Sequence, residues 1–168
     1  NVLFEFIVSD EWIQQHHDIE VLSNGNILVL AWEKKLQEDV ILKGKVNHTG
    51  VLYIDMILEL QPISSNNANI VWEWHFWDHL IQNVNTELDN YGNILDNPEL
   101  LDINYLGLSG EGPNPDNNPD FIHCNAIHYN QDLDQIILTS RRANEIYIID
   151  HSTTTEEAMG HSGGIYGK

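Results

Sequence analysis

Residues 121–150 constrain the fold most, because they predict three short antiparallel strands in direct succession. The stretch is FIHCNAIHYNQDLDQIILTSRRANEIYIID, in which runs rich in Ile and Tyr alternate with polar clusters rich in Asn and Asp. Such runs form strands, and such clusters form turns. The expected strands are residues 121–129, 135–140 and 146–150, with turns at 130–134 and 143–145. A meander of this kind places the chain in the all-β class.

The polar residues of this meander indicate a binding site. His123 lies inside the first apolar run, and the only two arginines of the chain, Arg141 and Arg142, end the second. Successive strand residues point to opposite faces, so only one of the two arginines can face His123. A histidine and an arginine brought together in this way form an anion site.

The first half of the chain predicts the four strands of one propeller blade. His16-His17-Asp18 opens a hairpin in which residues 19–22 and 27–31 flank an Asn-Gly turn, the strongest short hairpin signal. Two further strands are expected at residues 50–60 and 69–77. Residues 27–30 are apolar on both faces, which suits a strand covered on each side by another sheet. Propeller blades bury their sheets in this way.

An internal repeat favours the same architecture. The motif FEF at residues 4–6, followed by Asp10, matches WEW at residues 72–74, followed by Asp78, and both offsets are 68 residues (4 to 72, 10 to 78). A second match, from His17 to His123, has an offset of 106 residues (17 to 123). The 38 additional residues (106 less 68) predict an insertion between the two blades.

The insertion, residues 78–120, is expected to be the helical part of the chain. Asp78 can cap a helix, and Asn97-Pro98 can open a second short helix that runs to Asn104. The apolar face of the first helix is expected to be Leu80, Ile81, Val84 and Leu88.

The chain is therefore expected to be part of a single β-propeller domain and a piece of a longer protein. Residues 1–8 would be the last strand of a blade, 16–77 a complete blade, 78–120 the helical insertion, and 121–168 most of the next blade.

The charge of the chain excludes several classes of partner. Its 26 acidic and 7 basic residues give a net charge of −19, which argues against binding to nucleic acid or to an anionic membrane. No apolar run is long enough to insert into a bilayer. The ordinary interpretation of such a charge is a solvated acidic surface. The alternative is a divalent-cation site, and the oxygen-rich loop offers a calcium candidate made of Asp116, Asn117, Asn118 and Asp120. The same cluster also suits an ordinary turn.

The repeat places His17 and His123 at the start of the first strand in successive blades. First strands line the central channel of a propeller, so His17 (or its neighbour His16), His123 and one arginine would share a site. A pair of histidines can also bind a metal. An arginine beside them favours an anion instead, because it would repel a divalent cation.

Three stretches resemble the bacterial arylsulfotransferase family: HHDIEVLSNGNILVL at residues 16–30, IVWEWHFWDHL at 70–80, and the meander at 121–150. The most specific part is the pattern His123, Asn125, Ser140 and Arg141. The resemblance implies a six-bladed propeller, a periplasmic or secreted location, and transfer of sulfate between phenols without the nucleotide donor PAPS. It implies no cofactor, and the partners would be a small aryl sulfate and a phenol.

By position, His17, His123 and Arg141 match the family's catalytic sulfate-binding residues, and His16, Asn125 and Ser140 are the further substrate-binding candidates. The family's nucleophilic histidine, which carries the sulfuryl group as a sulfohistidine, lies in a later His-Asp motif that no residue here matches. We therefore expect the 168 residues alone to be inactive.

Two alternatives remain at this point. One is a propeller that binds a ligand or a partner protein without catalysis. The other is a calcium-stabilised carbohydrate-active propeller that uses the acidic loop. The row Trp72, Trp74, Phe76 and Trp77 could stack on an aryl ring, but alternating aromatic residues more often pack between blades.

Overall fold

The first of two principal sheets has four antiparallel strands in the order β1-β2-β3-β4. In this computed structural model, which describes residues 1–105, 119–160 and 163–165, the strands are β1 (Ile13–Val21), β2 (Ile27–Lys35), β3 (Leu52–Ser64) and β4 (Asn67–His75). Gly25, at φ 87°, sits in the predicted Asn-Gly turn between β1 and β2. The predicted hairpin and the two strands that follow it are confirmed.

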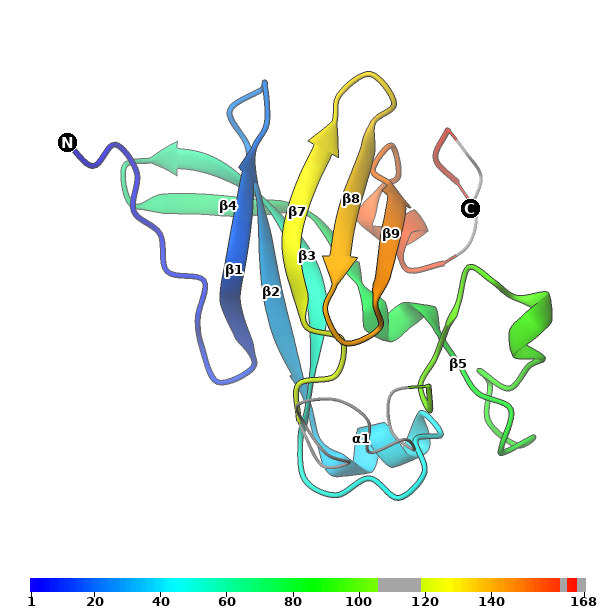
Figure 1. Cartoon of the computed structure of the whole chain (residues 1–168). Coiled ribbons are helices and arrows are strands. Elements are labelled where there is room, and N and C mark those ends of the chain that lie inside the picture. Colours follow the sequence, from blue (N-terminus) through cyan, green and yellow to red (C-terminus); the bar gives the residue numbers. More distant parts are fainter. Residues whose placement is uncertain (106–118, 161–162, 166–168) are drawn as a thin grey trace.

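The second sheet is the predicted meander, with β7 (Cys124–Asn130), β8 (Gln135–Ser140) and β9 (Glu145–Asp150) in consecutive order. Figure 1 shows β7 of this sheet beside β1 of the first sheet, and these two strands are in contact. The two sheets are therefore in contact through β1 and β7, the first strand of each sheet.

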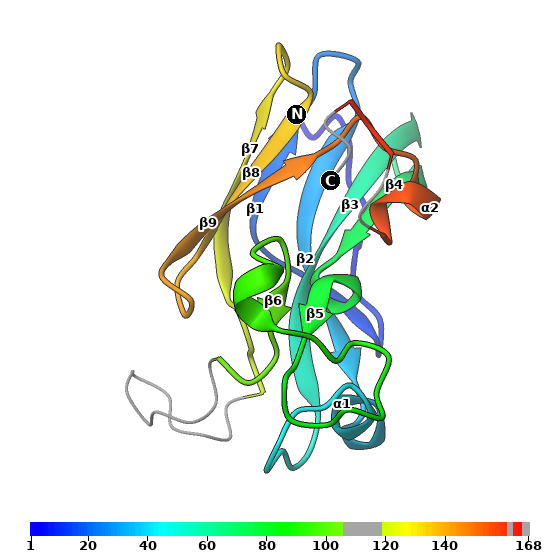
Figure 2. The same cartoon turned by 90° about the vertical axis from the view of Figure 1, so that its right-hand side faces the viewer.

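Short elements connect and flank the sheets. They are α1 (Gln37–Leu42), the 3₁₀ turn η1 (Phe76–His79), β5 (Leu80–Ile81), the 3₁₀ turn η2 (Ile94–Asp96), β6 (Leu101–Asp102) and α2 (Thr155–Ala158). β5 and β6 pair in parallel. Figure 2 shows β5 and β6 below the second sheet, with α2 beside β4.

The main core lies between the two sheets. Leu30 and Ile54 of the first sheet and Ile127 and Leu138 of the second belong to one cluster of buried side chains. A smaller cluster on the other side of the first sheet contains Val29, Ala31, Met56, Leu58 and Leu60. Each fully buried aliphatic side chain contributes about 1.5–3 kcal/mol, so these clusters hold the strands that carry the polar residues.

The predicted strand at residues 1–8 is absent. Residues 1–8 form no strand, and single backbone bonds such as Glu5 N to Ser65 O and Gln15 N to Val8 O hold them. The FEF motif therefore has an isolated backbone bond in place of consecutive strand pairing, and Phe6 packs against the smaller cluster. Its match to WEW, which lies in β4, is therefore a match of sequence and not of strand structure.

The predicted helices at residues 78–104 are also absent from that described part of the chain. Leu80 and Ile81 pair with Leu101 and Asp102 as short strands, and backbone bonds of Gln82 to Asn90 and Gly92 extend this contact. The apolar spacing at 80, 81, 84 and 88 was helical in period, but long-range pairing overrode it. The α-helices that the structure describes, α1 and α2, lie outside the predicted insertion.

The all-β prediction is confirmed at the level of a β-rich structure whose sheets remain open. The closed propeller and its six blades stay predictions.

Candidate functional site

His17 lies in a bulge in β1. The register of β1 against β2 shifts between Gln15 and Ile19, and His17 has a φ of 52°. Residues other than glycine rarely occupy this left-handed region, although His does so more often than most. The bulge gives the two neighbouring histidines different surroundings, with His16 buried and His17 exposed.

His123 repeats this local structure 106 residues later. It directly precedes β7, has a φ of 56°, and is followed by a register shift between Cys124 and Ala126. The common backbone conformation supports the predicted equivalence of His17 and His123. Left-handed conformations of this kind cost about 1–3 kcal/mol and gather at functional sites.

The two histidine side chains meet across the sheets. His17 Nε2 and His123 Nε2 lie 3.0 Å apart, and the ring centroids are 4.8 Å apart. Asn125 Nδ2 lies 3.3 Å from His17 Nε2. Three of the six predicted site residues therefore converge on one point. We call His17 and His123 the open pair.

Asp120 holds the other side of His123. Its Oδ2 accepts a hydrogen bond from His123 Nδ1, and its backbone carbonyl accepts one from the Arg142 guanidinium. Next to it, Phe121 N donates to Tyr53 O at 2.9 Å, which ties this segment to β3. Asp120 was predicted only as a calcium candidate, and its bond to His123 was not predicted. The available signal was its position three residues before His123.

The two arginines have separate surroundings, as the alternation of strand residues predicted. Arg142 is half-buried and bonds to Asp120 O, whereas Arg141 is exposed. Arg141 N donates to His123 O at 3.0 Å, so its backbone lies directly beside the open pair. Within the described parts of the chain, no carboxylate forms an ion pair with Arg141.

His16 and Ser140 lie beneath the open pair and face other groups. His16 Nε2 is 3.2 Å from Oδ1 of the fully buried Asp55, and its ring stacks on Trp32 at 4.2 Å. The Ser140 hydroxyl donates to Ile122 O at 2.8 Å and accepts from Ala143 N at 3.1 Å. The Ser140 hydroxyl therefore holds backbone next to the site, whereas His16 contacts other side chains.

The surroundings of the open pair favour a neutral His17. Its partial burial, and then the neighbouring His16 and His123, lower the pKa of His17 below its ordinary 6.5, and Asp120 and Asp55 only partly oppose them. Near neutral pH, one nitrogen of this ring therefore carries a lone pair.

The calcium prediction falls mostly outside the described residues, because Asp116, Asn117 and Asn118 lie there. The remaining member, Asp120, uses its carboxylate to bind His123. A search of the described residues for groups of three or more His, Cys, Asp or Glu suited to a metal found none.

Trp32 is the aromatic residue that the sequence did not single out. Its ring centroid lies 6.4 Å from that of His123 and 6.0 Å from that of Tyr53. In contrast, Trp72, Trp74 and Phe76 are buried in the main core and Trp77 packs against it, so this row packs inside the protein, while its place between two blades stays a prediction.

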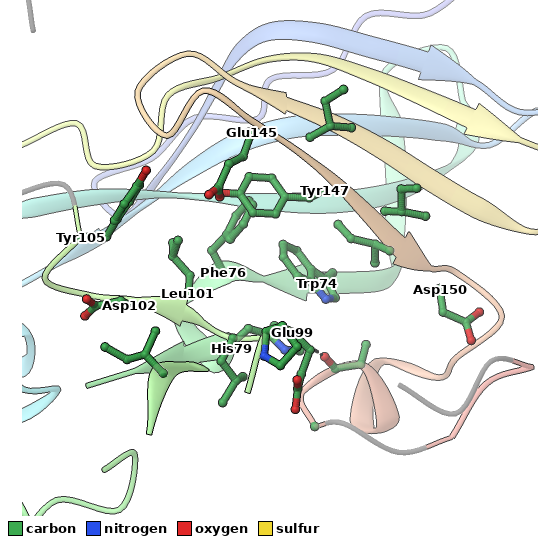
Figure 3. A pocket seen from close by; sticks show the side chains of 18 of the residues that line it. Trp74, Phe76, His79, Glu99, Leu101, Asp102, Tyr105, Glu145, Tyr147 and Asp150 are labelled. Atoms are coloured by element: carbon green, nitrogen blue, oxygen red, sulfur yellow. Dashed lines mark hydrogen bonds between the residues drawn. The ribbon is translucent and has the colours of Figure 1, made fainter. Parts of the chain in front are cut away.

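A cavity of about 590 Å³ lies elsewhere, between β9 and the segment from β4 to β6. Figure 3 shows Trp74, Phe76 and Tyr147 among the side chains that line it, with Glu99 beside His79. None of the six predicted site residues lines this cavity. The convergent hydrogen-bonding groups of the open pair are the stronger indication of a functional site, because a cavity without such groups does not indicate which reaction it could support.

The sequence model of the arylsulfotransferase (ASST) family matches residues 1–163. The chain belongs to the arylsulfotransferase family. This arylsulfotransferase-family chain has both histidines of the open pair and Arg141 within the matched range. A search of curated proteins and a search of solved structures gave no significant match.

Among the described residues of this arylsulfotransferase-family chain, no helix combines the length and the apolar character needed to cross a membrane.

Proposed function

We propose that this protein binds the sulfuryl group of a phenolic sulfate ester at the open pair and takes part in its transfer to a phenol acceptor. The observation that carries this proposal is the 3.0 Å approach of His17 Nε2 and His123 Nε2 across two sheets. Membership of the arylsulfotransferase family supports sulfuryl transfer at the level of the family.

The residues suit the charge of the ligand. A sulfuryl group in transfer spreads negative charge over three oxygens, and fixed donors and cations stabilise that charge. The two Nε2 atoms and the Asn125 amide supply donors at one point. Arg141, whose backbone N bonds to His123 O, would supply a permanent positive charge, which a protein with a net charge of −19 needs in order to attract an anion.

The aryl ring has a candidate surface in Trp32 and Tyr53. The Trp32 ring lies beside His123 and next to the Tyr53 ring, whereas the tryptophans of β4 are enclosed in the core. An aromatic face next to the anion site would place the ester oxygen between the ring and the open pair.

The wider arrangement is part of the proposal. We infer that the two sheets are neighbouring blades of a propeller and that β1 and β7 line its channel. The sulfohistidine step of the family is assigned to no residue of this chain. The 168 residues are therefore expected to bind an aryl sulfate without turning it over.

Calorimetric titration with p-nitrophenyl sulfate tests the binding. Arg141→Ala is expected to weaken it by about 10–100-fold, because one charge-assisted contact contributes about 1.5–3 kcal/mol. The matched control is Lys34→Gln, which removes the same charge from β2, where Lys34 lies over Trp12. Unchanged affinity in Arg141→Ala, or equal losses in both variants, would reject the assignment of Arg141.

A further inference from the structure

The geometry of the open pair depends on how β7 is held against the first sheet, because its two histidines come from different sheets. His17 lies in the bulge of β1, and His123 directly precedes β7 and its register shift. The two Nε2 atoms can lie 3.0 Å apart only if the backbones of these two segments keep their relative position. The contacts that join the two segments therefore decide whether the pair forms.

Asp55 of β3 contacts a neighbour of each histidine. Its Oδ1 accepts a hydrogen bond from Cys124 N at 2.9 Å, and Cys124 directly follows His123. The same oxygen lies 3.2 Å from Nε2 of His16, which directly precedes His17. A single carboxylate thus contacts the residue next to each member of the open pair.

Asp18, the residue after His17, makes a second connection to β7. Its Oδ2 accepts a hydrogen bond from Ile127 N at 3.2 Å. The two bonded N–H groups, of Cys124 and Ile127, lie on either side of the register shift in β7. Because hydrogen bonds to ionised acceptors are stronger than those between neutral groups, the two carboxylates fix this part of β7 to the first sheet.

The charge of Asp55 is unfavourable for the ligand. Burial and the two neighbouring histidines lower the pKa of His17, and the negative charge of Asp55 is among those that oppose them, so this charge acts on a ring of the open pair. The same charge would repel an anion there. Asp55 is also 0% exposed, and the burial of a carboxylate costs free energy. Neither attraction of an anion nor burial explains this carboxylate, whereas its bond to Cys124 N does.

We propose that Asp55 and Asp18 are positioning residues of the open pair, whose bonds to Cys124 N and Ile127 N keep His123 within reach of His17 so that both rings can bind one sulfuryl group. This inference rests on the proposed function, because the ligand is the sulfuryl group. It assigns a role to two carboxylates outside the predicted site.

Two substitutions of Asp55 separate the bond from the charge. Asp55→Asn and Asp55→Leu remove the same negative charge and are similar in size, but only asparagine keeps an oxygen that can accept from Cys124 N. Asp55→Asn is expected to bind inorganic sulfate at least as tightly as the wild type, because a repulsive charge is lost. Asp55→Leu is expected to bind it about tenfold more weakly, as is typical when a group that orients a ligand-binding histidine is removed. Calorimetric titration measures both affinities.

The ring contact itself can be observed without a ligand. A nuclear Overhauser effect between the ring protons of His17 and His123 reports the approach of the two rings, whose centroids are 4.8 Å apart. It is expected in the wild type and in Asp55→Asn, and it should be absent from Asp55→Leu. If Asp55 only stabilised the fold, the folded Asp55→Leu protein would keep this effect.

Leu58→Ala is the control for a loss of stability alone. Leu58 is also in β3, is 1% exposed, and belongs to the smaller cluster on the other side of the first sheet. The cavity left by this substitution destabilises the protein without removing either carboxylate bond. Its sulfate affinity and its ring contact are expected to equal those of the wild type.

Asp18→Ala tests the second carboxylate at a partly exposed position, where folding tolerates substitution better than in the core. It is expected to weaken sulfate binding by about fivefold, the factor for one hydrogen bond of ordinary net strength, and to weaken the ring contact. Asp18→Asn, which keeps one acceptor oxygen, is expected to recover part of both losses. Wild-type affinity in Asp18→Ala would overturn the role of Asp18, and this pair of variants decides the proposal if Asp55→Leu does not fold.

The remaining outcomes separate this inference from the proposed function. Equal sulfate affinity in Asp55→Asn and Asp55→Leu, or a ring contact that persists in Asp55→Leu, would overturn the role of Asp55 and leave the sulfuryl site intact. Absence of sulfate and aryl sulfate binding to the wild type at millimolar concentrations would overturn the proposed function, while the ring contact would still decide whether the carboxylates position the pair. A circular dichroism spectrum equal to that of the wild type shows that each variant is folded.

Discussion

His123 and His151 both connect the two sheets, but their partners differ. His151 Nδ1 is 2.8 Å from Asp134 Oδ1, and its Nε2 is 3.1 Å from Glu59 Oε2 of β3. We call these three residues the closed clamp. His123 has a carboxylate on one nitrogen only, and its other nitrogen faces His17.

The different partners indicate a structural role for His151 and a ligand-binding role for His123. In the closed clamp, every ring nitrogen is bound by a carboxylate, and further bonds join Tyr129 to Asp134 and Asn26 to Glu59. No ligand can enter without breaking an ion pair, so the cluster stabilises the contact between sheets. In the open pair, the contact between two imidazoles is weaker than either would make with an anion, and a ligand can replace it.

The largest effect is expected from His151→Ala. Loss of the imidazole leaves Glu59, which is 6% exposed, without its counterion, and breaking such a buried pair costs about 3–5 kcal/mol. Urea denaturation near pH 6 measures this loss. The double variant His151→Leu/Glu59→Leu is expected to recover most of it, since no buried charge remains. A loss below about 1 kcal/mol in the single variant would show that the clamp does not hold the sheets.

The closed clamp also makes the stability of the protein depend on pH. Burial opposes protonation of His151, but hydrogen bonds to Glu59 and Asp134 outweigh it and raise the pKa of His151 above 6.5. The bond from His151 lowers the pKa of Glu59 below its ordinary 4.5.

The sign follows from these two shifts. The contribution of His151 to the free energy of unfolding is complete below pH 6.5 and is lost as the pH rises through the pKa of His151 in the folded protein. The contribution of Glu59 is complete above pH 4.5 and is lost as the pH falls through the pKa of Glu59 in the folded protein. The unfolding free energy of the wild-type protein, relative to that of the double leucine variant, should therefore be highest between about pH 4.5 and 6.5. A difference in unfolding free energy that stays constant from pH 4 to 9 would contradict the clamp.

A smaller effect is expected from His123→Gly. Glycine adopts a φ of 56° without strain, which offsets part of the loss of the bond to Asp120, so the variant should lose no more than about 1 kcal/mol of stability while it loses sulfate binding. Thermal unfolding and calorimetry measure the two quantities on the same sample. A loss of several kcal/mol would show that His123 is a structural residue like His151.

The smallest effect is expected from Thr154→Ala, which removes the capping box at the start of α2. Loss of an N-cap costs about 1 kcal/mol. Because α2 contacts β4, whereas the open pair lies on β1 and directly before β7, anion binding should be unchanged. Weaker sulfate binding in this variant would show that stability and binding are not separate, and that the comparison does not hold.

The sequence predicted the strands and the contact of His17 with His123, because alternation and repeat spacing are local signals that the fold preserves. It failed at residues 78–104, where the side chain of Gln82 accepts bonds from Val84 N and Asn85 N and closes a turn in place of a helix. It also missed Asp120 and Trp32, whose roles depend on the approach of β3 and on ring contacts that have no periodic signal in the sequence.

Nitrogen-15 NMR of the histidine side chains during titration with p-nitrophenyl sulfate tests whether the open pair binds the anion while the closed clamp does not. The Nε2 resonances of His17 and His123 are expected to shift together with one dissociation constant, while the resonances of both His151 nitrogens stay unchanged. Equal shifts at all three histidines, or shifts at His151 alone, would contradict it.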